Sequence, residues 1–153
     1  MLKNPTKKKY LKWFFIAGVT LLLIGAGIYL YYILKPHKDT ANVKADYVVE
    51  AIPFIKEFEK DVAEANTKYA EKIIAVTGTV TATEAADTTI NIKMEDSSSG
   101  SYLIFDFQKQ HLDEARSLKP QDVVTIKGSC SGGIFSKILG TYFVSFKRST
   151  LIK

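Results

Sequence analysis

The sequence predicts an all-β or α+β fold, a five-stranded barrel with an amphipathic helix before it, preceded by one transmembrane helix. Three patterns predict this: an uncharged apolar run, an apolar stripe at helical spacing, and short segments of alternating apolar and polar residues. We therefore expect a basic cytoplasmic N-terminus, a transmembrane anchor, a linker and a folded domain, at residues 1–12, 13–34, 35–42 and 43–153.

The apolar run extends from Trp13 to Leu34 without a charged residue. A helix of this length extends about 33 Å, enough to cross a hydrocarbon core of about 30 Å. A cleavable signal has a shorter apolar region and a small-residue cleavage site, whereas this run ends in the bulky residues 29–34. The sequence therefore predicts an uncleaved signal anchor.

Charge is distributed unevenly around the anchor. Five lysines precede it, whereas Lys35 and Lys38 follow it. The positive-inside rule then predicts a single-pass protein of the cell (inner) membrane, with a cytoplasmic N-terminus and an extracytoplasmic C-terminal domain. Residues 1–38 hold seven lysines and no acid, whereas residues 39–153 hold 14 Lys/Arg against 16 Asp/Glu, a net charge of −2. The folded domain lacks the basic surface that binding to a phosphate backbone requires.

Residues 43–69 are expected to form the amphipathic helix, with Pro53 causing a kink or a restart. The apolar stripe consists of Val48, Ile52, Ile55, Phe58, Val62, Ala65 and Tyr69. Packing on the protein's own sheet is the expected use of this face, and self-association through it is the alternative.

Five alternating segments are expected to form strands, at residues 73–81, 89–94, 102–107, 123–130 and 140–147. A polar hairpin loop is expected at 95–101, a short helix at 108–118 and a loop at 131–139. Five strands with a helix between the third and the fourth is the element order of an oligonucleotide/oligosaccharide-binding (OB) barrel. Gly78 lies within the first strand, which such a barrel must bend sharply.

Two stretches resemble a known family. Residues 65–72 (ANTKYAEK) with 76–80 (VTGTV), and residues 118–130 (LKPQDVVTIKGSC), are similar to motifs of the bacterial tRNA-anticodon-binding-like OB-fold family. The similarity covers roughly residues 45–147, and Gln121 stands where glycine is common in the family. The resemblance implies an OB fold and carries over no catalytic residues.

No constellation of residues indicates an enzyme, a metal site or a cofactor. His37 and His111 are far apart, and both are expected to be solvated. Cys130 is expected to be a small core residue, because neither histidine has a reason to approach it. Glu95 and Asp96 are expected to lie at a solvated hairpin tip.

An OB barrel binds ligands on the exposed face of its second and third strands and on the adjoining loops. The candidates here are Thr89, Asn91, Lys93, Tyr102, Ile104, Phe135, Ser136 and Lys137. Tyr102 and Phe135 could stack on planar ligands, although these residues could also be ordinary surface, with Phe135 in the barrel mouth.

We therefore expect a non-enzymatic, membrane-anchored extracytoplasmic OB module that binds a protein or a small ligand of the cell envelope. The alternative is an OB domain that binds single-stranded nucleic acid, and Asp106 on the same face argues against it. A structural role through self-association is the third hypothesis.

Overall fold

The computed structural model describes residues 5–34, 39–85 and 88–152, and side chains from residue 13 onward. The first part of the expected linker, residues 35–38, and the first four residues of the expected basic N-terminus lie outside this range. The chain consists of two compact units that divide after His37.

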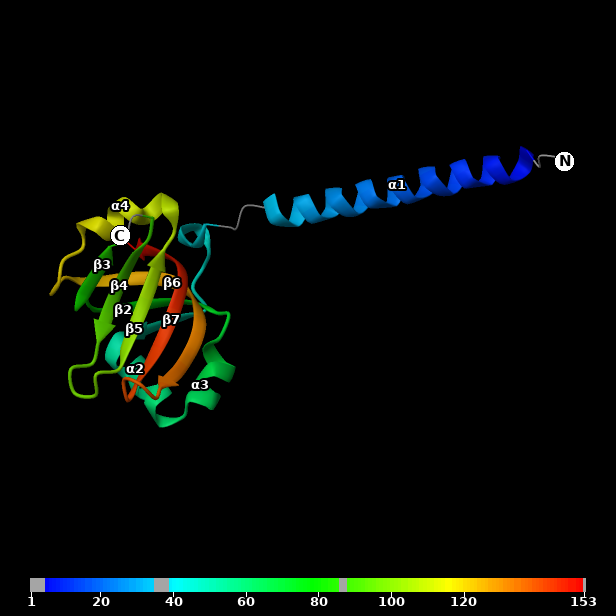
Figure 1. Cartoon of the computed structure of the whole chain (residues 1–153). Helices are drawn as coiled ribbons and strands as arrows, with labels where there is room; N and C mark the ends of the chain where they lie inside the picture. The colour runs from blue at the N-terminus through cyan, green and yellow to red at the C-terminus, as the bar shows by residue number, and fades with distance from the viewer. Residues whose placement is uncertain (1–4, 35–38, 86–87, 153) are drawn as a thin grey trace. The chain divides into compact units, whose positions relative to one another are not determined.

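Helix α1 (Pro5–Leu34) forms the first unit (Figure 1). Its segment Trp13–Leu34 is long and apolar enough to cross a membrane by length and composition. The side chains of this segment are exposed throughout. The predicted apolar helix is confirmed.

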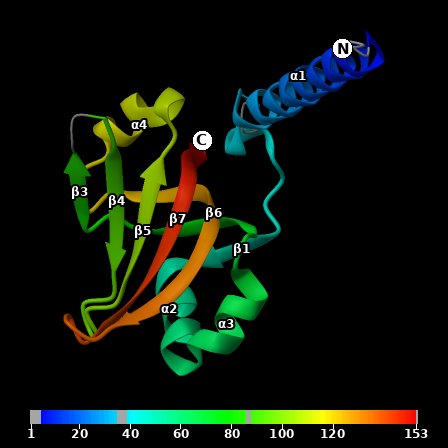
Figure 2. The same cartoon turned by 45° about the vertical axis from the view of Figure 1, so that its right-hand side comes forward.

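The second unit is an α+β domain built on one mixed sheet, in which seven strands are described (Figure 2). The strands are β1 (Tyr47–Glu50), β2 (Ile73–Thr79), β3 (Ala82–Ala85), β4 (Ile90–Glu95), β5 (Tyr102–Phe107), β6 (Val123–Ser136) and β7 (Thr141–Ile152). Their order is β1-β2-β6-β7-β5-β4-β3, with parallel pairs β1–β2 and β5–β7. The 3-10 turn η2 (Lys109–His111) and helix α4 (Leu112–Ser117) connect β5 to β6, where a helix is predicted.

Two differences account for seven strands where five are predicted. Residues 47–50 form β1, which pairs with β2, instead of the first turns of the expected helix. The other additional strand is β3, which follows the first expected strand (residues 73–81) and is separated from β2 by Val80 and Thr81. At this point the Val80 N–H donates to the Asp122 carbonyl (2.9 Å), and the Thr81 N–H donates to the Lys93 carbonyl (2.8 Å).

The helical part of the segment forms two short helices, α2 (Ala51–Lys60) and α3 (Val62–Tyr69). Pro53 lies in the first turn of α2. Backbone N–H groups in a first turn have no acceptor within the helix, so the absence of one in Pro53 costs no helical hydrogen bond. The helical path breaks instead at Asp61, whose carboxylate caps α3 by accepting from the Ala63 and Glu64 N–H groups. The predicted stripe is wrong at Val48, which is 77% exposed, and at Ile52, which is 44% exposed.

Strand β6 is longer than predicted, because the expected loop at 131–139 is mostly strand, and β7 is longer because it continues to Ile152. Gly132 lies at a bulge with φ +96°, a conformation that favours glycine. Asn66 of α3 then pairs with the next residue: its amide donates to the Gly133 carbonyl (2.8 Å) and accepts from the Gly133 N–H (2.7 Å). These contacts let the strand continue through two glycines.

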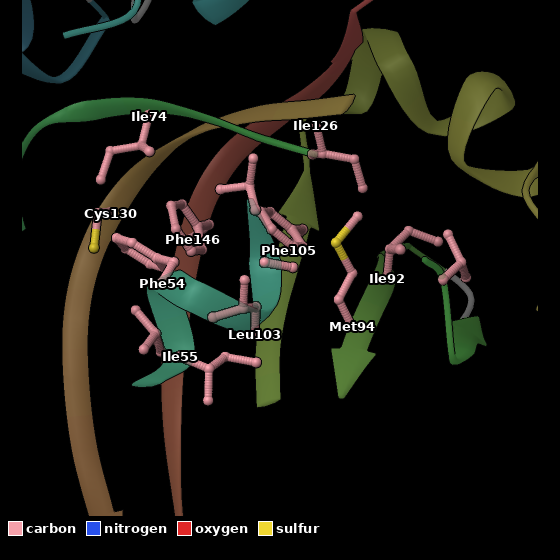
Figure 3. Packing of buried hydrophobic residues seen from close by; sticks show 14 of the residues in the cluster. Phe54, Ile55, Ile74, Ile92, Met94, Leu103, Phe105, Ile126, Cys130 and Phe146 are labelled. Carbon is pink, nitrogen blue, oxygen red and sulfur yellow. The ribbon is translucent and has the colours of Figure 1, made fainter. Parts of the chain in front are cut away.

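The core lies between the sheet and α2 (Figure 3). Phe54 and Phe58 of α2 pack edge to face at 5.1 Å, and Phe105 of β5 stacks on Phe146 of β7 at 4.6 Å. Every second side chain of β4 and β5 is buried, as alternation along the expected strands requires: Ile90, Ile92, Met94, Leu103, Phe105 and Phe107. The alternation of these two strands is confirmed.

The described end of the expected linker, residues 39–42, is fixed to the domain and includes the 3-10 turn η1 (Thr40–Asn42). The buried Lys127 donates from Nζ to the carbonyls of Ala41 (2.9 Å) and Val43 (2.8 Å). His111 lies within 3.0 Å of Asp39 and 3.2 Å of Glu114, and its side chain is only 15% exposed. The expectation of a solvated His111 is therefore wrong.

Candidate ligand-binding face

Alternation along β4 and β5 turns four of the predicted site residues to one outer face. Asn91 and Lys93 alternate with buried residues of β4, and Tyr102 and Ile104 alternate with buried residues of β5. Lys93 lies opposite Ile104 across the antiparallel pair. The strands thus place these four side chains on one surface.

The parallel pairing of β5 with β7 adds Phe143 to this face. Phe143 lies opposite Tyr102, and the two rings stack at 5.7 Å between centroids with an interplanar angle of 12°. On β6, Ile134 lies opposite Phe143 and is 58% exposed. Ile104, Tyr102, Phe143 and Ile134 therefore form an apolar strip across three adjacent strands, called the outer strip below.

Lys93 covers part of the outer strip. Its Nζ lies 4.1 Å from the centroid of the Tyr102 ring, a cation–π contact, and 3.8 Å from Glu84 of β3. The Tyr102 ring thus contacts both the Phe143 ring and the Lys93 ammonium. A planar ligand on the same ring would compete with these contacts for the area of the Tyr102 ring.

Asp106 brings a carboxylate to the end of the same face. It lies opposite Asn91 on β4. Partial burial raises the pKa of Asp106, and the charge of Lys147 opposes this rise. A carboxylate there disfavours a phosphate backbone and can accept hydrogen bonds from N–H or O–H groups.

The remaining predicted residues lie apart from the outer strip. Thr89 is exposed just before β4, and Lys137 is exposed in the β6–β7 turn beside Ser136. Phe135 lies opposite Tyr142, on the other side of the hairpin from Ile134, and its ring is 4.9 Å from that of Tyr142. Phe135 and Tyr102 are therefore not expected to stack on the same ligand. Phe135 is 46% exposed, not enclosed.

Phe143 was not predicted as a site residue, although the sequence contained a signal for it. Phe143 lies between Tyr142 and Val144 in the last expected strand, so alternation turns its side chain to the face opposite theirs. Its position beside Tyr102 depends on the register of a parallel pair that joins segments about 40 residues apart. Alternation predicts the face of the sheet on which a side chain lies, but not which residue of the adjacent strand lies beside it.

The side chains of Cys130 and Asp96, which could in principle react, are buried in the fold. Cys130 is fully buried, and burial raises the pKa of its thiol to about 11, so the thiol is protonated at neutral pH. Asp96 is also buried, contrary to the expected solvated tip, and forms an ion pair with Lys56 of α2 at 2.7 Å. Among the described residues, no three His, Cys, Asp or Glu side chains are grouped as metal ligands would be.

A recess of about 260 Å³ lies beside the start of α2, away from the outer strip. It is lined in part by Ile52, Pro53, Thr79 and Glu95. The outer strip itself is a surface formed by neighbouring strands. It therefore resembles a docking surface more than an enclosing pocket.

Comparison with solved structures finds similar folds. A protein described as a nucleic acid-binding lipoprotein, from Klebsiella pneumoniae subsp. pneumoniae, matches with a TM-score of 0.55 at 17% identity, covering 78% of this chain and 100% of that chain. Asparaginyl-tRNA synthetase from Pyrococcus horikoshii matches with a TM-score of 0.38 at 14% identity, covering 56% of this chain and 21% of that chain. The first likeness concerns the fold alone.

No curated protein sequence matches the chain. The model of the tRNA_anti-like family, in contrast, matches residues 1–139. This match includes α1 as well as most of the folded domain. The chain therefore belongs to the tRNA_anti-like family.

Proposed function

We propose that the domain is an OB-type barrel, in which β2 and β3 are the two halves of one bent strand. Only Val80 and Thr81 separate them, while β2 pairs with β6 and β3 pairs with β4. Counted as one strand, they give five barrel strands with α4 between the third and fourth, and β1 is an addition beside β2. This order supports the proposal because it matches the OB connectivity.

The proposed function is non-catalytic binding of a protein partner in the cell envelope, by a domain that α1 anchors in the inner membrane and that lies outside the cytoplasm. The outer strip is the observation that carries this proposal. Exposed apolar patches on soluble domains often mark interaction sites, and aromatic residues are enriched in the centres of protein interfaces. A small ligand is the less favoured occupant, since such ligands bind mostly in concave pockets.

Single-stranded nucleic acid is the second candidate, and the description of the Klebsiella protein favours it. The net charge of −2 in residues 39–153 and Asp106 on the face argue against it. The engaged ring of Tyr102 argues in the same direction, because base stacking needs an accessible ring face.

Site-specific photo-crosslinking in cells tests the protein-binding proposal. Full-length protein with a photoreactive phenylalanine analogue in place of Tyr102 should yield discrete protein adducts. The same analogue in place of Val123 serves as the control. Val123 is exposed and lies at the start of β6, at the opposite end of that strand from Ile134 of the outer strip. Equal adducts at both positions, or none at Tyr102, would overturn the proposal.

Binding of labelled single strands to the full-length protein in detergent tests the second candidate. Nucleic-acid binding predicts an affinity that falls steeply with salt and with Lys93→Ala. We expect no such binding at low salt. Salt-sensitive binding that Tyr102→Ala abolishes would contradict the proposed protein partner and would make nucleic acid the ligand of this face.

A further inference from the structure

The turn between β6 and β7 exposes two aliphatic side chains at its tip. Ile138 is 96% exposed and Leu139 is 61% exposed. The turn has a defined hydrogen-bonded structure: the Gly140 N–H donates to the Ser136 carbonyl (2.8 Å), and the Leu139 N–H donates to the Ser136 hydroxyl (3.2 Å). Gly140 has φ +69°, as such a turn requires. These hydrogen bonds fix the backbone that carries the two exposed side chains.

Apolar groups continue behind the tip on both sides of the hairpin. Phe135 and Tyr142 pack together on one side, and Ile134 lies opposite Phe143 on the other. Residues 134–142 contain one charged residue, Lys137, and no acid, whereas the domain as a whole has a net charge of −2. The hairpin thus has aliphatic groups at its end, aromatic rings behind them and a cation beside them.

The adjacent β4–β5 hairpin has a polar tip, unlike the apolar tip of the β6–β7 hairpin. The β4–β5 turn lies next to the β6–β7 turn (Figure 2), and the Tyr142 N–H donates to the Ser101 hydroxyl at 3.3 Å. Its tip exposes Ser97 and Ser98. Two neighbouring turns of the same sheet therefore differ sharply in polarity.

We propose that the β6–β7 tip inserts into the interfacial region of a lipid bilayer that contains anionic headgroups. Aliphatic groups such as Ile138 and Leu139 reach the acyl boundary, the Phe135 and Tyr142 rings settle at headgroup depth, and Lys137 pairs with anionic headgroups, which is the order found along this hairpin. The bilayer is the proposed binding surface because α1, as a membrane anchor, would keep the domain close to it. Such a tether raises the effective concentration of the tethered surface. This inference rests on the proposed anchoring role of α1.

The test uses the full-length protein in vesicles of phosphatidylethanolamine and phosphatidylglycerol. An environment-sensitive nitrobenzoxadiazole dye is attached to Ile138→Cys and, as the matched control, to Ser97→Cys on the neighbouring turn. The native Cys130 is fully buried, so the dye reaches the exposed engineered cysteine. Resistance to alkaline carbonate extraction separately confirms that α1 is inserted, so failure of the anchor is distinguished from failure of the tip.

We expect a several-fold rise in dye emission at position 138, with a blue shift and quenching by nitroxide groups on the lipid acyl chains. Emission at position 97 should remain close to that in water. Water-like emission at position 138 with α1 inserted would overturn the inference. A rise that depends on protein concentration and that acyl-chain nitroxides do not quench would also overturn it, and would indicate a second copy of the chain.

Discussion

Gly78→Ala is predicted to destabilise the domain by forcing α2 away from the sheet. A Cβ atom on Gly78 would lie 2.6 Å from the Cβ of Ala51 at the start of α2, and 2.8 Å from the Sδ of Met94. The Met94 side chain is flexible enough to move, whereas the Ala51 Cβ is fixed to the helix backbone. Overpacking of this kind costs about 1–3 kcal/mol.

The double variant Ala51→Gly/Gly78→Ala tests whether that contact is the cause. Ala51→Gly alone removes a methyl group from the first helical position and should cost at most about 1 kcal/mol. In the double variant the two Cβ atoms no longer meet, so the total loss should fall below the sum of the single losses by about 1 kcal/mol.

Urea unfolding of the full-length protein in detergent micelles measures these losses. Near-UV circular dichroism is a suitable signal, because four tyrosines lie in the domain, at residues 47, 69, 102 and 142, whereas the only tryptophan, Trp13, lies in α1. A Gly78→Ala variant as stable as the wild type, or single losses that simply add, would refute the proposed close contact between α2 and β2.

Three further predictions concern individual side chains of the domain. Gln121 has φ +79°, so Gln121→Gly should stabilise the domain by about 1 kcal/mol in the same urea assay. Asn66→Ala should cost about 1–3 kcal/mol, because it leaves the Gly133 N–H and carbonyl without their partner. The hydrogen-bonded ion pair with Lys56 lowers the pKa of Asp96 below its unfolded value of about 3.9, so its stabilisation is complete above that pH and is lost as the pH falls further. The difference in urea midpoint between wild type and Asp96→Asn should therefore shrink from pH 7 to pH 3, and a constant difference would contradict this.

Alternation and composition predicted α1, β4 and β5 because each depends on local sequence. An uncharged apolar run of this length predicts one long helix, and the buried side chains Ile92 and Phe105 follow from period two alone. Four predicted site residues share a face for the same reason. The positions that local patterns determine are therefore the ones that the structure confirms.

The differences arise where a distant contact determines the local structure. Val48 fits the helical stripe by spacing, but pairing with β2 makes its segment a strand and leaves Val48 exposed. Asp96 belongs to a polar loop, but Lys56 reaches it from α2. Phe143 joins Tyr102 only through the parallel β5–β7 register. None of these partners lies near its counterpart in the sequence.

A pair of topology reporters fused after Lys153 tests the proposed anchored, extracytoplasmic domain most directly. One reporter is active only outside the cytoplasm and the other only inside, so an inactive fusion can be distinguished from an inverted one. The lysines before the apolar run predict activity of the outside reporter alone. Activity of the inside reporter alone would place the outer strip in the cytoplasm and contradict a partner in the cell envelope.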